Sequence, residues 1–163
     1  MKATVLYHSK TGTTKRMAEV IVEGMRTVEG VEAEAFSIDA VDEAFIKESR
    51  CVVLGTPIYF ADLSGTVKVW LETSARPLGL AGKIGGAFAT ADYLHGGGEI
   101  GLQTILNHML VYGMLAYSGG GSFGAPVIHL GPVALKDKLD ESTDTFTVYG
   151  KRMAMKALEV FGK

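Results

Sequence analysis

Short apolar runs alternate with stretches of helical periodicity along the whole chain. The apolar runs predict five strands, at residues 3–8, 32–38, 51–55, 84–90 and 114–117. Between the first two runs, apolar residues recur three and four positions apart, at Met17, Val20, Ile21, Met25 and Val28. This is the spacing of a helix that buries one face. The same spacing predicts helices within residues 63–71, 102–110 and 154–161, and residues 39–49 predict a short, weakly periodic helix.

Strands that alternate with helices predict an α/β fold of three layers, in which helices cover both faces of a parallel sheet. Five strands suit a doubly wound sheet of order 2-1-3-4-5, and we expect residues 1–163 to form a single domain. A ligand in such a sheet binds outside the carboxyl ends of the strands, near the switch between the first and third. The loops after His8, Gly55 and Thr90 are therefore the candidate site. Residues 118–144 are expected to be the least regular part.

Composition and charge exclude several classes of protein. The hydrophobic content of 47% and charged content of 21% are those of an ordinary soluble domain, and a net charge of −2 argues against a nucleic-acid partner. No apolar run is long enough for a membrane span, and the first residues lack the pattern of a signal peptide. Cys51 is the single cysteine, so an internal disulfide is impossible, which suits a reducing compartment. We therefore expect a cytoplasmic protein.

A cluster of hydroxyl residues stands where the first strand meets the first helix. The segment consists of Ser9, Lys10, Thr11, Gly12, Thr13 and Thr14. A helix amino terminus offers unpaired N–H groups and a positive dipole to an anion, and the hydroxyl groups add further donors. Hydrogen bonds to a charged group are worth about 1.5–3 kcal/mol each, so several of them can hold a phosphate without an arginine. The alternative, that Thr11 or Thr13 only caps the helix, accounts for one hydroxyl group and not for four.

The other two loops combine aromatic, apolar and glycine residues. The first contains Thr56, Pro57, Ile58, Tyr59 and Phe60, and the second contains Thr90, Ala91, Asp92, Tyr93, His95 and Gly96. Large apolar groups in a loop favour a flat hydrophobic ligand, although Tyr59 and Phe60 could equally pack under the sheet. Tyr93 could stack on a ring, and His95 could donate a hydrogen bond or a proton near neutral pH. A flexible turn with a solvated histidine is an equal alternative for the second loop.

Residues 9–14 resemble the flavodoxin phosphate motif, Ser/Thr-x-Thr-Gly-x-Thr, at every defining position. The other loops resemble those of the NAD(P)H:quinone oxidoreductases of the tryptophan-repressor-binding-protein family, which share the flavodoxin-like fold. The residues that carry this second resemblance are Gly55-Thr56-Pro57, Phe60, Gly65, Gly82-Lys83, Phe88, His95-Gly96-Gly97, Glu99, Gly113-Met114 and Phe123-Gly124-Ala125. Together the two resemblances cover nearly the whole chain.

The resemblance implies non-covalent FMN, with its phosphate on residues 9–14 and its isoalloxazine ring between residues 56–60 and 90–96. It also implies an enzyme that passes hydride from NAD(P)H through FMN to a quinone or similar acceptor, and a homodimer or homotetramer. His95 and Tyr112 are the candidate catalytic residues. Tyr112 stands where relatives often have a histidine before Gly-Met, and a tyrosine is a poor proton source at neutral pH.

The alternative to an enzyme is an electron carrier of the flavodoxin type, which binds FMN and docks on a redox protein partner. Flavodoxins are typically strongly acidic, because charge steers them to their partners, and a net charge of −2 therefore favours the enzyme. Residues 119–124 spell the dinucleotide fingerprint Gly-x-Gly-x-x-Gly, but no helix is predicted after them, so we expect no second nucleotide site. The histidines form no metal-binding pattern, and Cys51 is interpreted as a packing residue.

Overall fold

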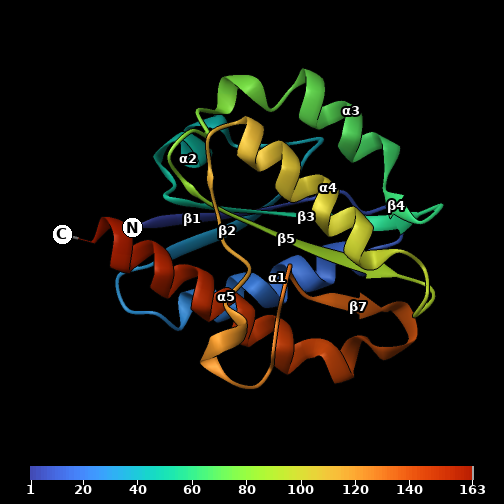
Figure 1. The fold of residues 1–163 in the computed structure, drawn as a ribbon. Coiled ribbons are helices and arrows are strands. Elements are labelled where there is room, and N and C mark those ends of the chain that lie inside the picture. Colours follow the sequence, from blue (N-terminus) through green and yellow to red (C-terminus); the bar gives the residue numbers. More distant parts are fainter. Residues whose placement is uncertain (163) are drawn as a thin grey trace.

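A computed structural model describes residues 1–162 and shows helices on both faces of a central sheet (Figure 1). The strands are β1 (Lys2–Tyr7), β2 (Glu32–Ser37), β3 (Cys51–Tyr59), β4 (Asp62–Leu63), β5 (Ile84–Ala91), β6 (Leu115–Ala116) and β7 (Val133–Leu135). The α-helices are α1 (Thr13–Arg26), α2 (Glu43–Glu48), α3 (Gly65–Thr73), α4 (Gly98–Val111) and α5 (Leu139–Phe161). Short 3₁₀ turns occupy Arg76–Leu78, Gly121–Phe123 and Lys136–Lys138. The predicted three-layer α/β fold is confirmed.

The order of strands across the sheet is β2-β1-β3-β5-β6, and these strands pair in parallel. It corresponds to the predicted order 2-1-3-4-5, because β5 and β6 are the fourth and fifth strands that the apolar runs predict. The numbering differs because two residues of β4 pair antiparallel with the end of β3. Tyr7 of β1 lies opposite Gly55 of β3, so the carboxyl ends of these strands meet at one edge of the sheet.

The fifth position in the sheet is divided between two strands. β6 pairs with the beginning of β5, where Leu115 lies opposite Ile84, and β7 pairs with its end, where Val133 lies opposite Ala89. β3 occupies the other side of β5, so β6 and β7 share one side. Residues 118–144, expected to be the least regular part of the chain, contain β7 and the first turn of α5 toward their carboxyl end, which the sequence did not predict. A three-residue strand is too short to show periodicity, and the first turn of α5 is largely polar.

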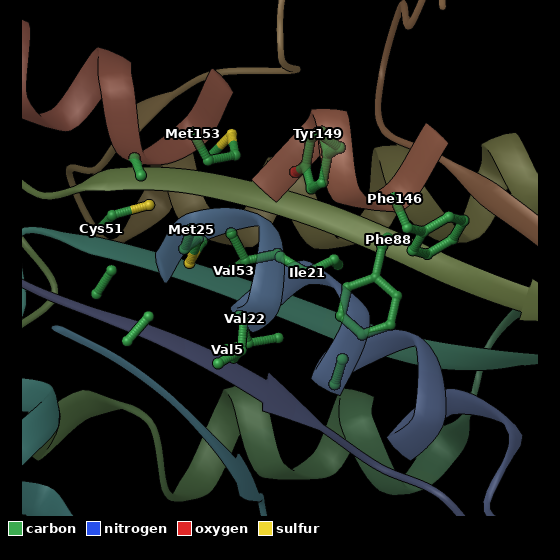
Figure 2. Packing of buried hydrophobic residues seen from close by; sticks show 14 of the residues in the cluster. Val5, Ile21, Val22, Met25, Cys51, Val53, Phe88, Phe146, Tyr149 and Met153 are labelled. Carbon is green, nitrogen blue, oxygen red and sulfur yellow. The ribbon is translucent and has the colours of Figure 1, made fainter. Parts of the chain in front are cut away.

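The two faces of the sheet are covered by different helices. In Figure 1, α1 and α5 lie on one face and α2, α3 and α4 on the other. Figure 2 shows the core under α1 and α5, where the rings of Phe88 and Phe146 meet edge to face with centroids 5.9 Å apart. The buried Tyr149 donates its hydroxyl hydrogen to the carbonyl oxygen of Ala87 at 3.1 Å. Cys51 is fully buried in the same cluster, and burial raises the pKa of its thiol to about 12, so it is a packing residue, as predicted.

Helices α1 and α5 approach each other through glycines, backbone against backbone. A methyl group added at Gly24 of α1 would lie 2.1 Å from the carbonyl oxygen of Thr147, and one added at Gly150 of α5 would lie 2.1 Å from that of Ile21. Both distances are far below van der Waals contact, so a larger residue cannot enter at this spacing. The close crossing keeps α1, which follows the hydroxyl-rich loop, fixed against the sheet.

A buried lysine donates hydrogen bonds to the carbonyl groups at the carboxyl end of α2. The Nζ atom of Lys83 donates hydrogen bonds to the carbonyl oxygens of Ile46 at 3.0 Å, Lys47 at 2.8 Å, and Ser49. These carbonyls lie at the carboxyl end of the helix, where a positive charge complements the helix dipole. Burial lowers the pKa of Lys83. Lys83 therefore has a structural role, because it stabilises the carboxyl end of α2.

Within residues 1–162, the helices are all too short or too polar to cross a membrane.

Candidate functional site

The carboxyl ends of β1, β3 and β5 and the segments that follow them come together at one edge of the sheet, as predicted. The strands are longer than expected, because β3 continues to Tyr59 and β5 to Ala91, so residues 56–59 and 90–91 belong to strands and not to loops. A cavity of about 130 Å³ lies among these segments. Its lining residues are Ser9, Lys10, Thr11, Thr13, Thr14, Pro57, Ile58, Tyr59, Thr90, Ala91, Asp92 and Lys136. Contributions from loops far apart in the sequence are what a ligand site at the switch point of a doubly wound sheet requires.

The beginning of α1 leaves its first N–H groups open to this cavity. Gly12 precedes the helix with a φ of 92°, a left-handed conformation that glycine adopts readily, and its N–H group donates to Ser9 Oγ at 3.1 Å. Among the described residues, no side chain caps the helix, and its first turn carries no acidic residue. The hydroxyl oxygens of Thr11 and Thr13 lie 3.3 Å from each other. The alternative that Thr11 or Thr13 caps the helix is therefore wrong, and the helix terminus can bind an anion.

Thr14 has a different position from the other hydroxyl residues of the loop. Its side chain is buried, and its Oγ1 atom lies 2.8 Å from Oγ1 of Thr90 at the end of β5. In such a pair one hydroxyl group donates to the other, and the second keeps its hydrogen for another acceptor. The pair thus joins the first turn of α1 to the strand that precedes the third loop.

A larger cavity of about 520 Å³ adjoins the first. It is lined by Ile58, Tyr59, Phe60, Ala61, Ala91, Asp92, Tyr93, His95 and Gly96. Four residues line both cavities, namely Ile58, Tyr59, Ala91 and Asp92, so the two spaces share a wall. The small cavity is rich in hydroxyl groups and the large one in aromatic side chains. This pairing suits a ligand with a polar anionic end and a flat ring.

The aromatic residues of the larger cavity lie at the surface. Phe60 is fully exposed, and Tyr59 and Tyr93 keep 39% and 75% of their surface accessible. The alternative that Tyr59 and Phe60 pack under the sheet is therefore wrong. Phe60 and Ala61 have φ values of 51° and 65°, which residues with a side chain rarely adopt and which cost about 1–3 kcal/mol each. Such strained backbone is concentrated at functional sites, and here it turns a large aromatic group toward solvent.

Three residues of the predicted site line neither cavity, namely Gly12, which directly precedes α1, Thr56 and Tyr112. Thr56 is buried, and its hydroxyl group accepts a hydrogen bond from the N–H of Ser64 at 3.0 Å and donates one to the carbonyl of Pro57 at 2.9 Å. It therefore holds β3 against Ser64, the residue that precedes α3. Tyr112 follows α4, whose 14 residues span about 21 Å, and its hydroxyl group donates to the carbonyl oxygen of Leu71.

Tyr112, expected as a catalytic residue, lies away from both cavities. The chain after Tyr112 enters β6, which pairs with the first residues of β5, at the edge of the sheet opposite to the cavities. The distance arises because α4 begins at the site and carries the chain away from it. His95, by contrast, is exposed and lines the larger cavity, and its catalytic role stays a prediction.

Charged groups surround the smaller cavity. The ammonium group of Lys10 lies 5.5 Å from the centre of the Tyr59 ring, and Lys136 reaches the cavity from the turn after β7. Sequence reasoning missed Lys136, because it follows a strand too short to be recognised. Asp92 is the acidic residue of the lining. In the part of the chain that is described, no cluster of three histidine, cysteine or acidic side chains could hold a metal ion.

Residues 119–124, which spell the dinucleotide fingerprint, do not lie between a long strand and a helix in the described structure. The sequence 119–124 forms a turn that includes Gly121–Phe123, and the chain then leads to β7 and not to a helix. The Gly-x-Gly-x-x-Gly pattern thus lacks the strand and helix that a dinucleotide site needs.

Comparison with known proteins agrees with this geometry. The flavodoxin family model matches residues 5–84. A flavodoxin of Clostridium saccharobutylicum is 42% identical over 161 aligned positions, which cover 99% of this chain and 100% of the relative. An NAD(P)H dehydrogenase (quinone) of Syntrophobacter fumaroxidans is 26% identical over 196 aligned positions, which cover 94% of this chain and 96% of the relative.

A comparison with a solved structure agrees with these sequence matches. The flavodoxin, WrbA-like protein from Agrobacterium tumefaciens superposes with a TM-score of 0.81 and 26% identity, and covers 97% of this chain and 98% of its own. The shared fold, together with 42% identity over the whole length of a known flavodoxin, shows that the chain belongs to the flavodoxin family.

Proposed function

We propose that the protein binds FMN non-covalently in the two adjoining cavities and carries electrons to and from redox partner proteins. The observation that carries this proposal is the open amino terminus of α1. The helix has no side-chain cap and no acidic residue in its first turn within the described chain, and hydroxyl groups surround it. A helix end arranged in this way suits a phosphate group.

The residues present fit FMN at both of its ends. Ser9, Thr11 and Thr13 supply donors around a cavity that also receives two lysines, which suits a phosphate. Tyr59 and Tyr93 line the larger cavity, where they can lie against a flat ring. Bound FMN would supply the redox chemistry, since its ring accepts and releases electrons. The side chains of this chain bind and orient it.

The lengths of the alignments support a carrier over an enzyme. The match to the Clostridium flavodoxin uses 161 positions, close to the 163 residues of this chain. The match to the Syntrophobacter dehydrogenase uses 196 positions, so that relative has segments with no counterpart here. The exposed aromatic residues at the rim of the larger cavity also suit contact with another protein. The net charge favours an enzyme, but these observations together favour an electron carrier.

An NAD(P)H:quinone oxidoreductase is the second candidate. The observation in its favour is the open cavity of about 520 Å³, which has the exposed His95 in its lining. A histidine at such a place can supply a proton near neutral pH to a quinone-like acceptor. In this case NAD(P)H is the co-substrate, and a homodimer or homotetramer is the expected assembly.

One experiment separates the two functions. Apoprotein is titrated with FMN, and binding is followed by the quenching of flavin fluorescence. The loaded protein is then mixed with NADH or NADPH under anaerobic conditions, and its visible absorbance is recorded. A carrier keeps its absorbance with both nucleotides and loses it with dithionite. Rapid bleaching by either nucleotide supports the oxidoreductase instead, and no binding of FMN contradicts both.

A further inference from the structure

We infer that Lys136 recognises the charge of the phosphate group, so that with Lys10 it makes the smaller cavity selective for a terminal phosphate monoester. The inference rests on the proposed binding of FMN and concerns how the site distinguishes its ligand. It goes beyond the hydroxyl-rich loop, which belongs to a different part of the chain.

The fold places Lys136 at the cavity through the pairing of β7. Leu135 lies opposite Ala91, the last residue of β5. Lys136 therefore leaves the sheet at the same edge as Asp92, and both residues line the cavity beside residues 9–14. The position depends on the sheet register and not on a flexible tail. Lys136 is exposed, so its ammonium group can adjust to a bound anion.

The positive charge of Lys136 is not used elsewhere in the described structure. Neither Lys10 nor Lys136 forms an ion pair with any of residues 1–162. Other cations nearby already have partners, because Arg16 pairs with Asp140, and Lys138 lies 3.7 Å from Glu141. Two uncompensated lysines thus face a cavity with one acidic residue in its lining.

This arrangement favours a doubly charged group. A phosphate monoester carries about −1.5 to −2 charges at pH 7, because its second pKa is about 6. A phosphodiester carries one negative charge, and a hydroxyl group carries none. Two lysines and the positive end of α1 therefore attract the monoester most strongly. Riboflavin has the same ring as FMN but no phosphate. A comparison of the two ligands therefore measures the contribution of the phosphate group to binding.

The test compares the variants Lys136→Gln and Lys138→Gln. Both remove one positive charge from the same turn, but Lys138 does not line the cavity. Dissociation constants for FMN and riboflavin are measured at pH 7.5 and low salt by the quenching of flavin fluorescence. We expect Lys136→Gln to weaken FMN binding about fivefold, the upper range for an exposed charge pair, and to leave riboflavin binding unchanged. Lys138→Gln should change neither constant by as much as twofold.

Two results would overturn the inference. One is an equal effect of both variants on FMN, which would show that only the general charge of the turn matters. The other is an equal loss of FMN and riboflavin binding in Lys136→Gln, which would show that the variant disturbs the site as a whole. A Lys136→Arg variant should retain FMN affinity within about twofold, because it keeps the charge.

Inorganic phosphate separates this inference from the proposed function. It is titrated into the apoprotein while the amide resonances of residues 9–14 are followed by NMR. Chemical-shift changes that saturate in the unmodified protein and weaken in Lys136→Gln support the inference, whether or not FMN binds. The absence of such changes in the unmodified protein, or equal changes in both proteins, contradicts it. Failure to bind FMN alone would contradict the proposed function and not this assignment.

Discussion

Replacing Gly150 with alanine is expected to destabilise the protein by about 2 kcal/mol, although alanine forms helices more readily than glycine. Helix propensity alone favours alanine by about 1 kcal/mol. The new methyl group would lie 2.1 Å from the carbonyl oxygen of Ile21, whereas carbon and oxygen ordinarily stay about 3.3 Å apart. The obstacle is backbone, which cannot rotate away as a side chain can. Helices α1 and α5 must therefore separate by about 1 Å, which puts the cost at the upper end of the usual range for overpacking, about 3 kcal/mol. Less the gain of about 1 kcal/mol in helix propensity, a net loss of about 2 kcal/mol remains.

Urea unfolding followed by far-UV circular dichroism measures this effect as a lower midpoint at an unchanged slope. Gly65→Ala is the matched control, because Gly65 begins α3 and a methyl group there meets nothing within 4 Å. It should change stability by no more than about 0.5 kcal/mol. Gly24→Ala opens the same helix pair, so the double variant with Gly150→Ala should cost less than the sum of the two. A Gly150→Ala protein as stable as the original, or full additivity, would refute the reasoning.

Three further predictions concern buried groups. Cys51→Ala should flatten the loss of stability between pH 9 and 10.5. The folded thiol has a pKa of about 12, above the usual 9.0, so above pH 9 Cys51 adds a loss of stability that approaches about 1.4 kcal/mol per pH unit. The buried Tyr149, whose pKa is also raised, contributes in both proteins, and equal pH slopes in the two would contradict the prediction. Tyr149→Phe should cost about 1 kcal/mol in urea unfolding, because the Ala87 carbonyl loses its donor; a neutral result would show that this bond contributes nothing. Lys83→Met should lower the urea midpoint by the equivalent of about 1–3 kcal/mol, because it removes the donor to three carbonyls; a higher midpoint would count against that role.

The order of the strands and helices could be predicted from the sequence, because most of them are long enough to show a pattern of hydrophobic residues. The runs that became β1, β3 and β5 are continuous apolar segments, and the stripe from Met17 to Met25 marks α1 without ambiguity. β7 has three residues, and the first turn of α5 is mostly polar, so neither shows the pattern from which it could be inferred. Pairing with β5 and packing against the sheet decide their structure.

The candidate site was predictable where it is local in sequence. Residues 9–14, the proposed anion-binding loop, are one contiguous segment, and their positions follow directly from the junction of β1 and α1. Lys136 could not be found in this way, because only the register of β7 brings it to the cavity. Tyr112 shows the converse error: a resemblance placed it near the site, whereas the length and direction of α4 place it at the opposite edge.

The divided fifth strand has a practical consequence for protein engineering. Sheet pairing constrains Leu115–Ala116 and Val133–Leu135, and each of these short strands takes its register from β5 independently of the other. Residues added at the exposed positions 122–125 between them lengthen the connection without shifting either register, and the entropic cost of a longer loop grows only slowly. Lys136 would keep its place, because it follows the second strand directly. The connection is therefore the position at which a reporter peptide could be grafted while both cavities stay intact.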